Sequence, residues 1–299
     1  MIYDVIIIGA GPAGLTAALY AARYKLNVIV FENKPCSATY AYSIENYPGI
    51  KKTNGIELVS KMQEQVKALG VEIKLEEVKE IIKDKFFIVR TEKQKYEART
   101  IILALGTEKR KLGLGEEKFI GKGVSYCAIC DAPLFREKDV AVLGGGNSAI
   151  MAALLLAKYA REVFLIYRGK ELKGDPIKVK ELEENKKIKI LLNTNIKQID
   201  DCKKLESVTL TDGAKIKISG LFIEIGSLVP AYLIEKIKLK TDKYGYILVN
   251  SHMETNVAGV YAAGDCIDKP LRQIVTATND GAIASHSIFN FLKKIDVTL

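Results

Sequence analysis

Residues 3–14 read YDVIIIGAGPAG, in which a β-branched run passes directly into three glycines spaced as GxGxxG. The run is typical of a buried strand in a parallel sheet, so we expect a strand over Tyr3–Ile8 and a helix from Pro12 to about Tyr24. The first glycine permits a tight turn, the second lets backbone N–H groups approach a pyrophosphate, and the third lets the helix pack closely on the strand. These glycines are Gly9, Gly11 and Gly14. The stretch predicts a dinucleotide-binding fold whose helix N-terminus receives the phosphates.

A second strand is predicted over Asn27–Phe31, and it leads into Glu32. This acid lies about eighteen residues past Gly14, near the spacing expected for a carboxylate that accepts hydrogen bonds from ribose hydroxyls. A GxGxxG motif alone is a weak signal. Strand, glycines, helix, strand and acid in this order favour nucleotide binding over a chance glycine-rich turn.

The same order of features returns about 135 residues later. A strand is predicted over Asp139–Leu143, a glycine motif follows at residues 144–149, its helix runs to about Tyr159, and the next strand covers Glu162–Tyr167. The candidate binding positions in this motif are Gly144, Gly146, Asn147, Ser148 and Ala149. Two dinucleotide folds in one chain imply two nucleotides, normally a tightly held flavin and an exchangeable nicotinamide.

The loop after the strand at Glu162–Tyr167 is where the two nicotinamide cofactors are distinguished. An acid there favours the 2′-hydroxyl of NAD, whereas a cation favours the 2′-phosphate of NADP. Residues 167–173 read YRGKELK, with cations at Arg168, Lys170 and Lys173. These cations indicate NADP, and the alternative is that they are solvated loop charges.

The remaining pattern divides the chain into a discontinuous first fold and an insert. The other predicted elements are a helix over Gly55–Gly70, a small antiparallel sheet over Val71–Tyr96, strands over Thr100–Leu105, Leu221–Ile225 and Tyr246–Val249, a strand that delivers Asp265 next to Gly264, and a helix over Thr276–Phe291. The predicted class is α/β, with two Rossmann-like dinucleotide-binding domains, each in three layers around a central parallel sheet. The first domain is expected to cover residues 1–111 and 245–299, and the insert residues 112–244.

Residues 126–131 read YCAICD, which separates the thiols of Cys127 and Cys130 by two residues. Such a pair is a redox couple, half of a zinc site, or two buried thiols. A zinc site needs two further Cys or His ligands nearby. The other cysteines and the histidines are isolated in the sequence: Cys36, Cys202, Cys266, His252 and His286. We therefore expect no metal and favour redox chemistry, because the flanking nucleotide folds supply an electron source.

The chain has 299 residues, 48% of them hydrophobic, and a formal net charge of +9, which fits a soluble globular protein of about two domains. No apolar run approaches the roughly 18 residues that span a bilayer, and no secretory signal is visible. Five cysteines without a disulfide scaffold favour a reducing compartment, and we expect the cytoplasm. The lysines are dispersed and no nucleic-acid module is visible, so the charge indicates a solvated surface or steering of an acidic protein or anionic cofactor.

Together these motifs resemble the low-molecular-weight thioredoxin reductases, flavoprotein disulfide reductases with two dinucleotide-binding domains. The resemblance covers essentially the whole chain, and its specific mark is a CxxC pair inside the insert, just before the second glycine motif. The residues that carry it are Gly9–Gly14, Glu45–Gly49, Gly123–Asp131, Gly144–Ala149, Tyr261–Asp265 and Arg272–Gln273.

The resemblance implies FAD on the first fold and NADPH on the second. The implied FAD residues are Gly9, Gly11, Pro12, Ala13, Gly14, Glu32, Asn46, Gly106, Gly264, Asp265, Arg272, Gln273 and Ile274. The implied NADPH residues are Gly144, Gly146, Asn147, Ser148, Ala149, Arg168 and Lys173. The resemblance also implies a homodimer, and an insert that rotates to present the dithiol and the nicotinamide to the flavin in turn.

The same resemblance implies that electrons pass from FAD through a Cys127–Cys130 disulfide to thioredoxin or a thioredoxin-like protein. Cys130 would face the flavin, and Cys127 would attack the disulfide of the partner protein. Asp131 would move the proton, unless it is only a capping or surface acid.

Three stretches depart from the family pattern. A Gly-Gly-Gln stretch is missing near Ser37–Thr39, Asp131 is followed by Ala132 where the family has glycine, and the family's His-Arg-Arg and later Arg at the 2′-phosphate are reduced to Arg168 and Lys173. Lysine lacks the planar fork of arginine. NADPH stays the expected donor, and an acidic ferredoxin is the alternative.

Three other functions are weighed. A peroxiredoxin-reducing flavoprotein has the same core but usually an additional N-terminal thioredoxin-like domain. A ferredoxin–NADP reductase of this architecture lacks the dithiol. A non-catalytic sensor would bind flavin and signal through the disulfide without turnover.

Overall fold

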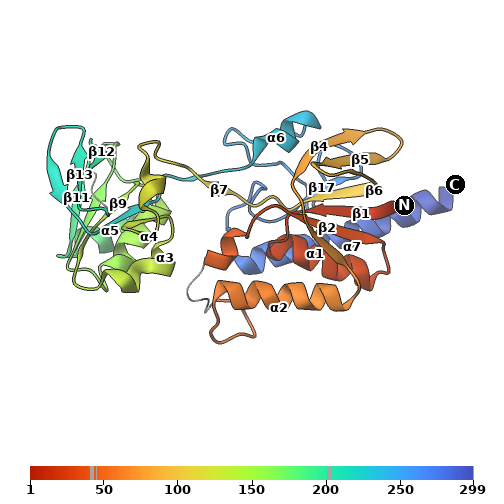
Figure 1. Ribbon diagram of the computed structural model, residues 1–299, viewed down its shortest axis with the longest axis horizontal. Coiled ribbons are helices and arrows are strands. Elements are labelled where there is room, and N and C mark those ends of the chain that lie inside the picture. Colours follow the sequence, from red (N-terminus) through yellow and green to blue (C-terminus); the bar gives the residue numbers. More distant parts are fainter. Residues whose placement is uncertain (41–43, 45, 201–203, 299) are drawn as a thin grey trace. The chain divides into compact units, whose positions relative to one another are not determined.

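The computed structural model (Figure 1) describes residues 1–298 except 41–43, 45 and 201–203, and the side chains of residues 40, 130 and 296–298 also lie outside this description. The chain folds into two units. The first combines Met1–Glu108 with Leu228–Leu299, and the second comprises Lys109–Ser227.

The chain returns to the first unit earlier than the sequence predicted. The expected boundary was residue 245, whereas the observed one is Leu228. Between them lies the short helix α6 (Ala231–Lys236), whose Leu233 and Ile234 are buried in the core of the first unit. Because these side chains complete that core, residues 228–244 belong to the first unit. The opening boundary, predicted after residue 111, lies at Glu108.

Parallel strands form the centre of the first unit. The opening strand β1 (Ile2–Ile8) pairs with β2 (Val28–Glu32) on one side and β6 (Lys95–Leu103) on the other. β3 (Glu72–Leu75) extends the sheet beyond β2, and β17 (Val260–Ala262) pairs with β6. The antiparallel strands β4 (Val78–Lys83) and β5 (Phe87–Thr91) continue from β6.

Two predictions in this unit were wrong in part. The antiparallel sheet expected over Val71–Tyr96 loses its first strand, because β3 pairs parallel with β2. The strand expected over Tyr246–Val249 does not form, and Ile247 makes isolated bridges to Thr241 and Ile267 instead. The predicted order of β1, the first helix and β2 is confirmed.

Three helices pack together on the parallel strands. α1 (Pro12–Arg23) contacts both α2 (Gly55–Ala68) and the long C-terminal helix α7 (Ile274–Thr298) (Figure 1). A short 3₁₀ turn, η1 (Ser37–Tyr40), precedes α2. The contact between α1 and α7 includes a buried hydrogen bond in which the Ser285 hydroxyl donates to the carbonyl of Ala17 at 2.6 Å.

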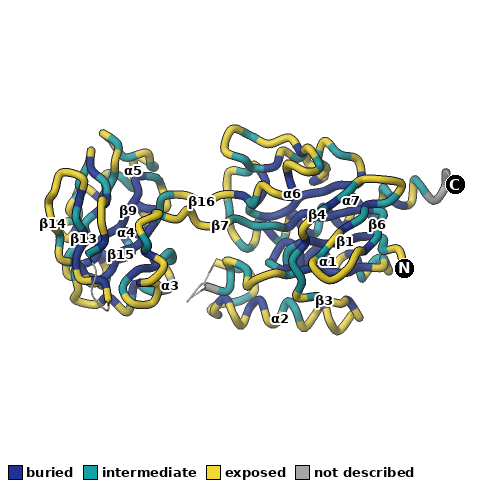
Figure 2. Tube along the Cα trace, turned by 45° about the horizontal axis from the view of Figure 1, so that its top comes forward, coloured by how far each residue is buried: buried dark blue, intermediate teal, exposed yellow. Residues whose placement is uncertain are grey.

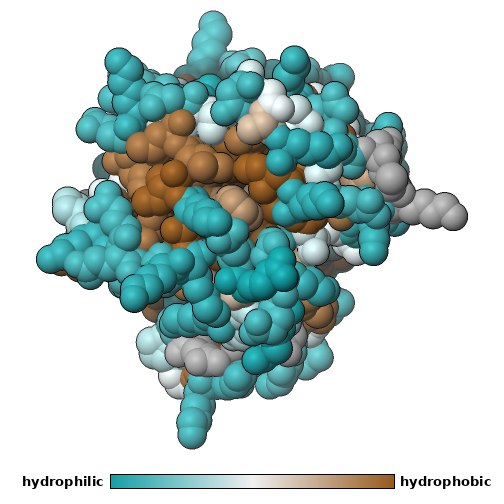
Figure 3. All heavy atoms as spheres, turned by 90° about the vertical axis from the view of Figure 1, so that its left-hand side faces the viewer, coloured by the Kyte–Doolittle hydropathy of each residue, from teal (hydrophilic) through white to brown (hydrophobic). Residues whose placement is uncertain are grey.

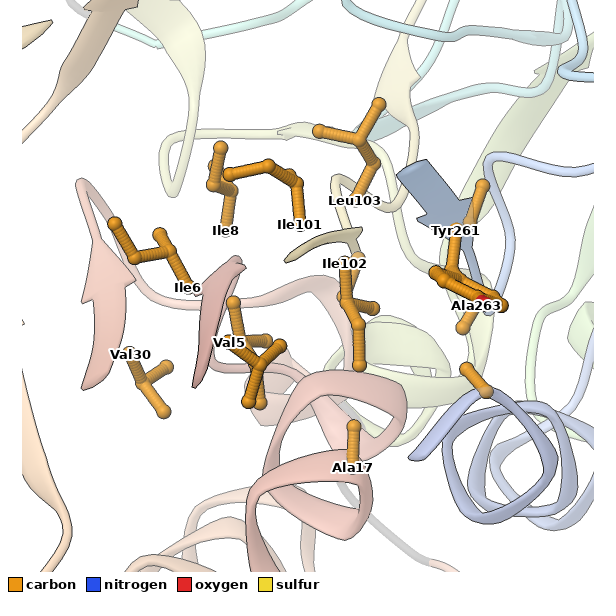
Figure 4. Close-up of a cluster of buried hydrophobic side chains, with 14 of the residues drawn as sticks. Val5, Ile6, Ile8, Ala17, Val30, Ile101, Ile102, Leu103, Tyr261 and Ala263 are labelled. Atoms are coloured by element: carbon orange, nitrogen blue, oxygen red, sulfur yellow. The ribbon is translucent and has the colours of Figure 1, made fainter. Parts of the chain in front are cut away.

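The core of the first unit follows the strands. Figure 2 shows the buried segments running along β1 and β6. The close-up in Figure 4 shows aliphatic side chains of these strands beside α1 and the strand end near Tyr261; the labelled members are Val5, Ile6, Ile8, Ala17, Val30, Ile101, Ile102, Leu103, Tyr261 and Ala263. This continuous aliphatic run fits a parallel sheet covered on both faces.

The second unit repeats the plan with five parallel strands. β9 (Asp139–Leu143) lies between β10 (Glu162–Ile166) and β15 (Gly220–Ile223), while β11 (Ile188–Leu191) and β8 (Val124–Ser125) form the edges. The predicted α/β class, with two Rossmann-like folds around parallel strands, is confirmed.

Two hydrophobic clusters cover the two faces of this second sheet. Val140 and Val142 face a cluster shared with helices, whereas Ala141 and Leu143 face a cluster shared with an antiparallel sheet. The helices are α3 (Ala128–Asp131), α4 (Asn147–Leu156) and α5 (Pro176–Glu183), with the 3₁₀ turn η3 (Ala132–Phe135). The antiparallel strands are β12 (Ile196–Asp200), β13 (Ser207–Leu210) and β14 (Lys215–Lys217).

Three short elements complete the description. The 3₁₀ turn η2 (Glu116–Phe119) precedes β8, and β7 (Glu108–Lys109) pairs with β16 (Ser227–Leu228).

Hydrophilic side chains surround an apolar area on the face shown in Figure 3. Among the described residues, no helix combines the length and the apolar character that a membrane span requires.

We expect Gly281→Ala to destabilise the protein although alanine favours a helix. A Cβ at residue 281 of α7 would lie 2.1 Å from the carbonyl oxygen of Ala13 on α1, so the two helices must separate. The expected loss is about 1–3 kcal/mol, measured as a lower urea midpoint. The control is Asn279→Ala, an exposed position on the same helix, which should change stability by less than about 0.5 kcal/mol. Equal midpoints for the two variants would contradict this packing.

Candidate functional site

The first glycine of each motif lies where the chain leaves a strand and turns sharply. Gly9 has φ +111° and Gly144 has φ +144°, a conformation that side chains rarely adopt. A Cβ at Gly9 would lie 2.1 Å from the carbonyl oxygen of Ala104, and one at Gly144 would lie 2.3 Å from that of Glu224. Glycine is therefore required at both turns, and each turn places a helix N-terminus at the carboxyl end of its strand.

These two helices begin without a side-chain cap. The N-cap residues are Gly11 for α1 and Gly146 for α4, and neither supplies a side-chain hydrogen bond. In contrast, Asn54 caps α2 and Asp175 caps α5, each accepting a first-turn N–H at 2.9 Å. Uncapped N–H groups and the positive end of the helix dipole are what a phosphate group needs.

Glu32 ends β2 beside the first motif, as predicted from the sequence. Its carboxyl is half-buried, and burial raises its pKa, an effect that Lys67 opposes. Cys36 is a free thiol whose side chain lies beside Gly11. Burial raises the pKa of Cys36, and the charge of Glu32 raises it further. The structure thus brings Gly11, Glu32 and Cys36 to one corner of the first unit.

Asp265 follows β17 and carries an unpartnered buried oxygen. Among the described residues nothing hydrogen-bonds its Oδ1 atom. Burial raises the pKa of Asp265, while the nearby cations Lys269 and Arg272 oppose that shift. Gly264, its neighbour, packs against Ala13 of α1, so the free oxygen lies near the uncapped helix. A buried acceptor of this kind fits a ligand that presents a hydroxyl group.

Arg272 and Gln273 are held by contacts within the first unit. The Arg272 guanidinium donates to the carbonyls of Asp265 at 3.2 Å and Ile267 at 3.0 Å, and it lies 3.8 Å from the centre of the Tyr246 ring. The Asn46 amide donates to Gln273 Oε1 at 3.0 Å, just before α7 begins at Ile274. Arg272 therefore fixes the loop that carries Asp265, and two residues predicted separately, Asn46 and Gln273, are in contact.

The remaining first-unit positions are glycine and helix-turn residues. Gly106 has φ +62° after β6, and Pro12, Ala13 and Gly14 form the buried first turn of α1. All the implied FAD residues lie in the first unit, at the carboxyl ends of its parallel strands or in the loops and first helical turns that follow them.

The loop after β10 is tied to the second glycine motif. The N–H of Lys173 donates to the carbonyl of Gly145 at 2.7 Å, and that of Asp175 donates to Asn147 Oδ1 at 2.7 Å. The ring of Tyr167 lies against Gly145. Residues 167–171 and Lys173 line a surface hollow of about 590 Å³.

The predicted cations of that loop are available to a ligand. Arg168 and Lys173 are exposed, as is Ser148 in the first turn of α4. Both cations line the hollow beside the uncapped helix. The structure therefore brings the implied nicotinamide residues of the motif and of the loop together.

The CxxC segment starts α3 in the second unit. Cys127 is disulfide-bonded and half-buried. The side chain of Cys130 and all of Cys202 lie outside the described residues, so the partner of Cys127 is part of the proposal below. Asp131 closes α3, its N–H donating to the carbonyl of Cys127 at 3.2 Å.

The CxxC segment and the residues that follow it have buried side chains packed on α4 and exposed apolar side chains that face solvent. Ala128 and Ala132 are buried against α4. Three large apolar side chains near the segment are exposed to solvent: Ile129, Leu134 and Met151. Exposed apolar side chains beside a disulfide-bonded cysteine suit contact with another protein.

Sequence reasoning missed three buried charged residues. Lys269 and Asp280 form a buried ion pair, and Asp280 also accepts from the N–H of Gly264 at 3.1 Å. Glu116, in the 3₁₀ turn η2, is completely buried. Lys269 and Asp280 are eleven residues apart, and Glu116 binds the loop just before it and Tyr126, and no sequence motif marked either arrangement.

Two nucleotide-type folds, one of which carries a disulfide-bonded CxxC cysteine, define the class of flavoprotein disulfide reductases. The family model described as pyridine nucleotide-disulphide oxidoreductase matches residues 3–281. The chain belongs to this family, it is an oxidoreductase, and its relatives are the low-molecular-weight thioredoxin reductases, as the sequence predicted.

Three relatives illustrate the likeness. The thioredoxin reductase of Bacillus subtilis (strain 168) is 40% identical, with 100% of this chain and 97% of that protein covered. The structure of Lactococcus lactis thioredoxin reductase matches with a TM-score of 0.82 and 35% identity over 98% of this chain and 99% of that one. A ferredoxin-flavin thioredoxin reductase from Clostridium acetobutylicum matches with a TM-score of 0.54 and 35% identity over 98% of both chains.

We expect Asp265→Asn to stabilise the ligand-free protein and to weaken flavin binding. Burial raises the folded-state pKa above the unfolded value, so the ionised carboxylate opposes folding at pH 7, and a neutral amide removes that penalty. A gain of about 1 kcal/mol in the free energy of unfolding would raise the thermal midpoint by roughly 2–4 °C.

The same variant should bind flavin roughly tenfold more weakly, measured by fluorescence titration of the ligand-free protein. Asp268→Asn, an exposed neighbour, is the control and should change neither quantity. A less stable Asp265→Asn protein with normal flavin affinity would contradict a ligand role for this carboxylate.

Proposed function

We propose that the chain is an FAD-dependent thioredoxin reductase that takes electrons from NADPH and delivers them through a Cys127–Cys130 disulfide to thioredoxin. The observation that carries this proposal is the disulfide-bonded Cys127 at the start of α3, which packs on the glycine-motif helix α4 of the same unit. The full-length relatives named thioredoxin reductase support it.

The first unit fits FAD by three independent features. α1 offers uncapped N–H groups for a pyrophosphate, Glu32 offers a carboxylate at the ribose spacing, and Asp265 offers a buried oxygen that needs a donor. Asn46 and Gln273, in contact with each other, lie on loops of the same unit. FAD, when bound, supplies the electron pair that opens a disulfide.

The thiols perform the exchange with the partner protein. The Cys127 thiolate attacks one sulfur of the partner's disulfide, forming a mixed disulfide and releasing the other sulfur as a thiolate. The Cys130 thiolate then attacks Cys127 and closes the Cys127–Cys130 disulfide, releasing the second partner sulfur. Two electrons and, after protonation, two protons have moved to the partner. Asp131, one residue after Cys130, is the group assigned to proton transfer.

The surface near the dithiol supports a protein substrate. Exposed Ile129 lies within the CxxC segment, exposed Leu134 follows it, and exposed Met151 belongs to α4. A thioredoxin-like partner would cover such apolar side chains while its disulfide meets Cys127. The homodimer that the resemblance implies and the cytoplasmic location expected from the cysteine content belong to the same proposal.

The donor is proposed from the loop after β10. Arg168 and Lys173 line the hollow beside α4 and supply charge for a 2′-phosphate. The loop lacks a second arginine fork because Gly169 follows Arg168. An acidic ferredoxin is the second candidate donor, supported by the net charge of +9 and by the 35% identity to a relative named for ferredoxin.

We expect Cys127→Ser and Cys130→Ser each to lower multiple-turnover thioredoxin reduction roughly a hundredfold or more, because neither can close the disulfide. Insulin-coupled turnover measures this effect, with flavin reduction followed separately by absorbance. The control is Cys202→Ser, which should retain turnover within about twofold. It also tests the pairing: a Cys202→Ser protein that loses turnover would assign the disulfide of Cys127 to Cys202.

The donor is tested by anaerobic flavin reduction with NADPH, NADH and reduced ferredoxin. We expect NADPH to bleach the flavin fastest, and Arg168→Ala and Lys173→Ala each to raise the KM for NADPH roughly tenfold without affecting NADH. Lys158→Ala, an exposed lysine after α4, is the control. If only ferredoxin reduces the flavin, ferredoxin is the electron donor and not NADPH. If the thiols are oxidised without multiple turnover, the protein is a redox sensor.

A further inference from the structure

Glu116 is a carboxylate with no exposed surface in the second unit. It accepts three backbone N–H groups and the hydroxyl of Tyr126, which donates to Oε1 at 2.9 Å. The backbone donors are Leu112 at 2.5 Å and Gly113 at 3.3 Å to Oε1, and Leu114 at 2.9 Å to Oε2. A buried charge is tolerated when its acceptor sites are satisfied in this way. Glu116 therefore ties the loop at residues 112–114 to the residue that precedes Cys127.

The bond between Glu116 and Tyr126 is charge-assisted. Burial raises the pKa of Glu116, but the hydrogen bonds from its own backbone, Tyr126 and the loop outweigh burial and leave the pKa lowered. Burial and the adjacent carboxylate both raise the pKa of Tyr126. The carboxylate thus stays ionised and the phenol stays a donor across the physiological pH range, which makes this a strong hydrogen bond.

Cys127 lies where the chain crosses the edge of the second sheet. β8 is the edge strand, and Tyr126 packs on the face covered by β12, β13 and β14. Ala128 and Ala132 pack on the opposite face, against α4. Ser125 Oγ accepts the N–H of Cys127 at 3.0 Å. Cys127 is therefore held from both faces, and on one of them the holding group is the Glu116–Tyr126 pair.

We propose that Glu116 and Tyr126 are positioning residues that keep the sulfur of Cys127 aligned for exchange once its disulfide has opened. In the oxidised protein the covalent bond itself restrains Cys127. In the dithiol state that restraint is gone, and alignment depends on the groups that fix the preceding peptide. Thiol–disulfide exchange requires the attacking sulfur to reach its target in line, so a loose Cys127 closes the disulfide less readily. The reaction named here rests on the proposed function.

The test is Tyr126→Phe, which removes only the hydroxyl. The full-length protein is equilibrated in glutathione buffers, in which the disulfide and two reduced glutathione molecules exchange with the dithiol and one oxidised glutathione. The dithiol fraction is read by alkylation and peptide mass spectrometry. We expect the equilibrium constant for disulfide closure to fall roughly fivefold to tenfold, with kcat for thioredoxin falling similarly and KM unchanged within about twofold.

Tyr159→Phe is the matched control in the same unit. The Tyr159 hydroxyl has no hydrogen bond among the described residues, and its ring lies 5.8 Å from the Arg136 guanidinium. The equilibrium constant for disulfide closure and the kcat for thioredoxin should both stay within about twofold of the wild type in Tyr159→Phe. Glu116→Gln, which keeps the size but not the charge, should shift closure in the same direction as Tyr126→Phe.

Two results would overturn the proposal: an unchanged closure constant in Tyr126→Phe, or a shift of equal size in Tyr159→Phe. A Tyr126→Phe protein that fails to fold would also overturn it, because the hydroxyl would then maintain the unit rather than align a thiol. The glutathione equilibrium uses neither flavin nor thioredoxin. If the wild type fails to reduce thioredoxin but Tyr126→Phe shifts closure, the proposed function fails and the positioning role stands.

Discussion

Two helix N-termini without side-chain caps are the constraint on which the arrangement of this protein depends. α1 and α4 each start at a glycine that offers no capping group, whereas α2 and α5 are capped by Asn54 and Asp175. Uncapped N–H groups lower helix stability unless a ligand or solvent satisfies them. Both helix starts lie at the carboxyl ends of parallel strands, β1 in the first unit and β9 in the second. The buried strands behind each turn supply the stability that the helix start lacks.

The position of the dithiol follows from the same sheet geometry. β8 is a two-residue edge strand paired with β15, so the chain leaves the sheet at Ser125, two residues before Cys127. Residues on either side of Cys127 then pack on opposite faces of the sheet. The disulfide is thus presented at an edge, where another protein can reach it, while its flanks remain fixed in two hydrophobic clusters. Rigid flanks and an accessible sulfur are the combination that exchange with a protein substrate needs.

Sequence patterns predicted the elements that neighbouring residues determine. They failed where contacts between residues distant in the sequence determine the structure. The run Tyr3–Ile8 and its glycines specify a strand, a turn and a helix through neighbouring residues, and all three formed. β3 was misassigned because its register with β2 is set across a helix, not by its own alternation. The return at Leu228 was missed because the six-residue helix α6 carries too few apolar positions to indicate which core it joins. Asp265 was predicted from its motif, whereas Lys269, Asp280 and Glu116 acquire partners only in the folded chain.

The loop proposed for nucleotide selection and the segment proposed for thiol chemistry occupy separate parts of the second unit, which bears on how the family pattern can vary. The loop after β10 is tied to α4 by backbone and Asn147 contacts that do not involve Arg168 or Lys173 side chains. Changes of charge in that loop therefore leave the helix start and the sheet intact. The CxxC segment contacts α4 through Ala128 and Ala132 and is anchored independently by Glu116. Altered charges in this loop are consequently compatible with an unaltered CxxC segment, because no described contact joins the loop cations to the segment that carries Cys127.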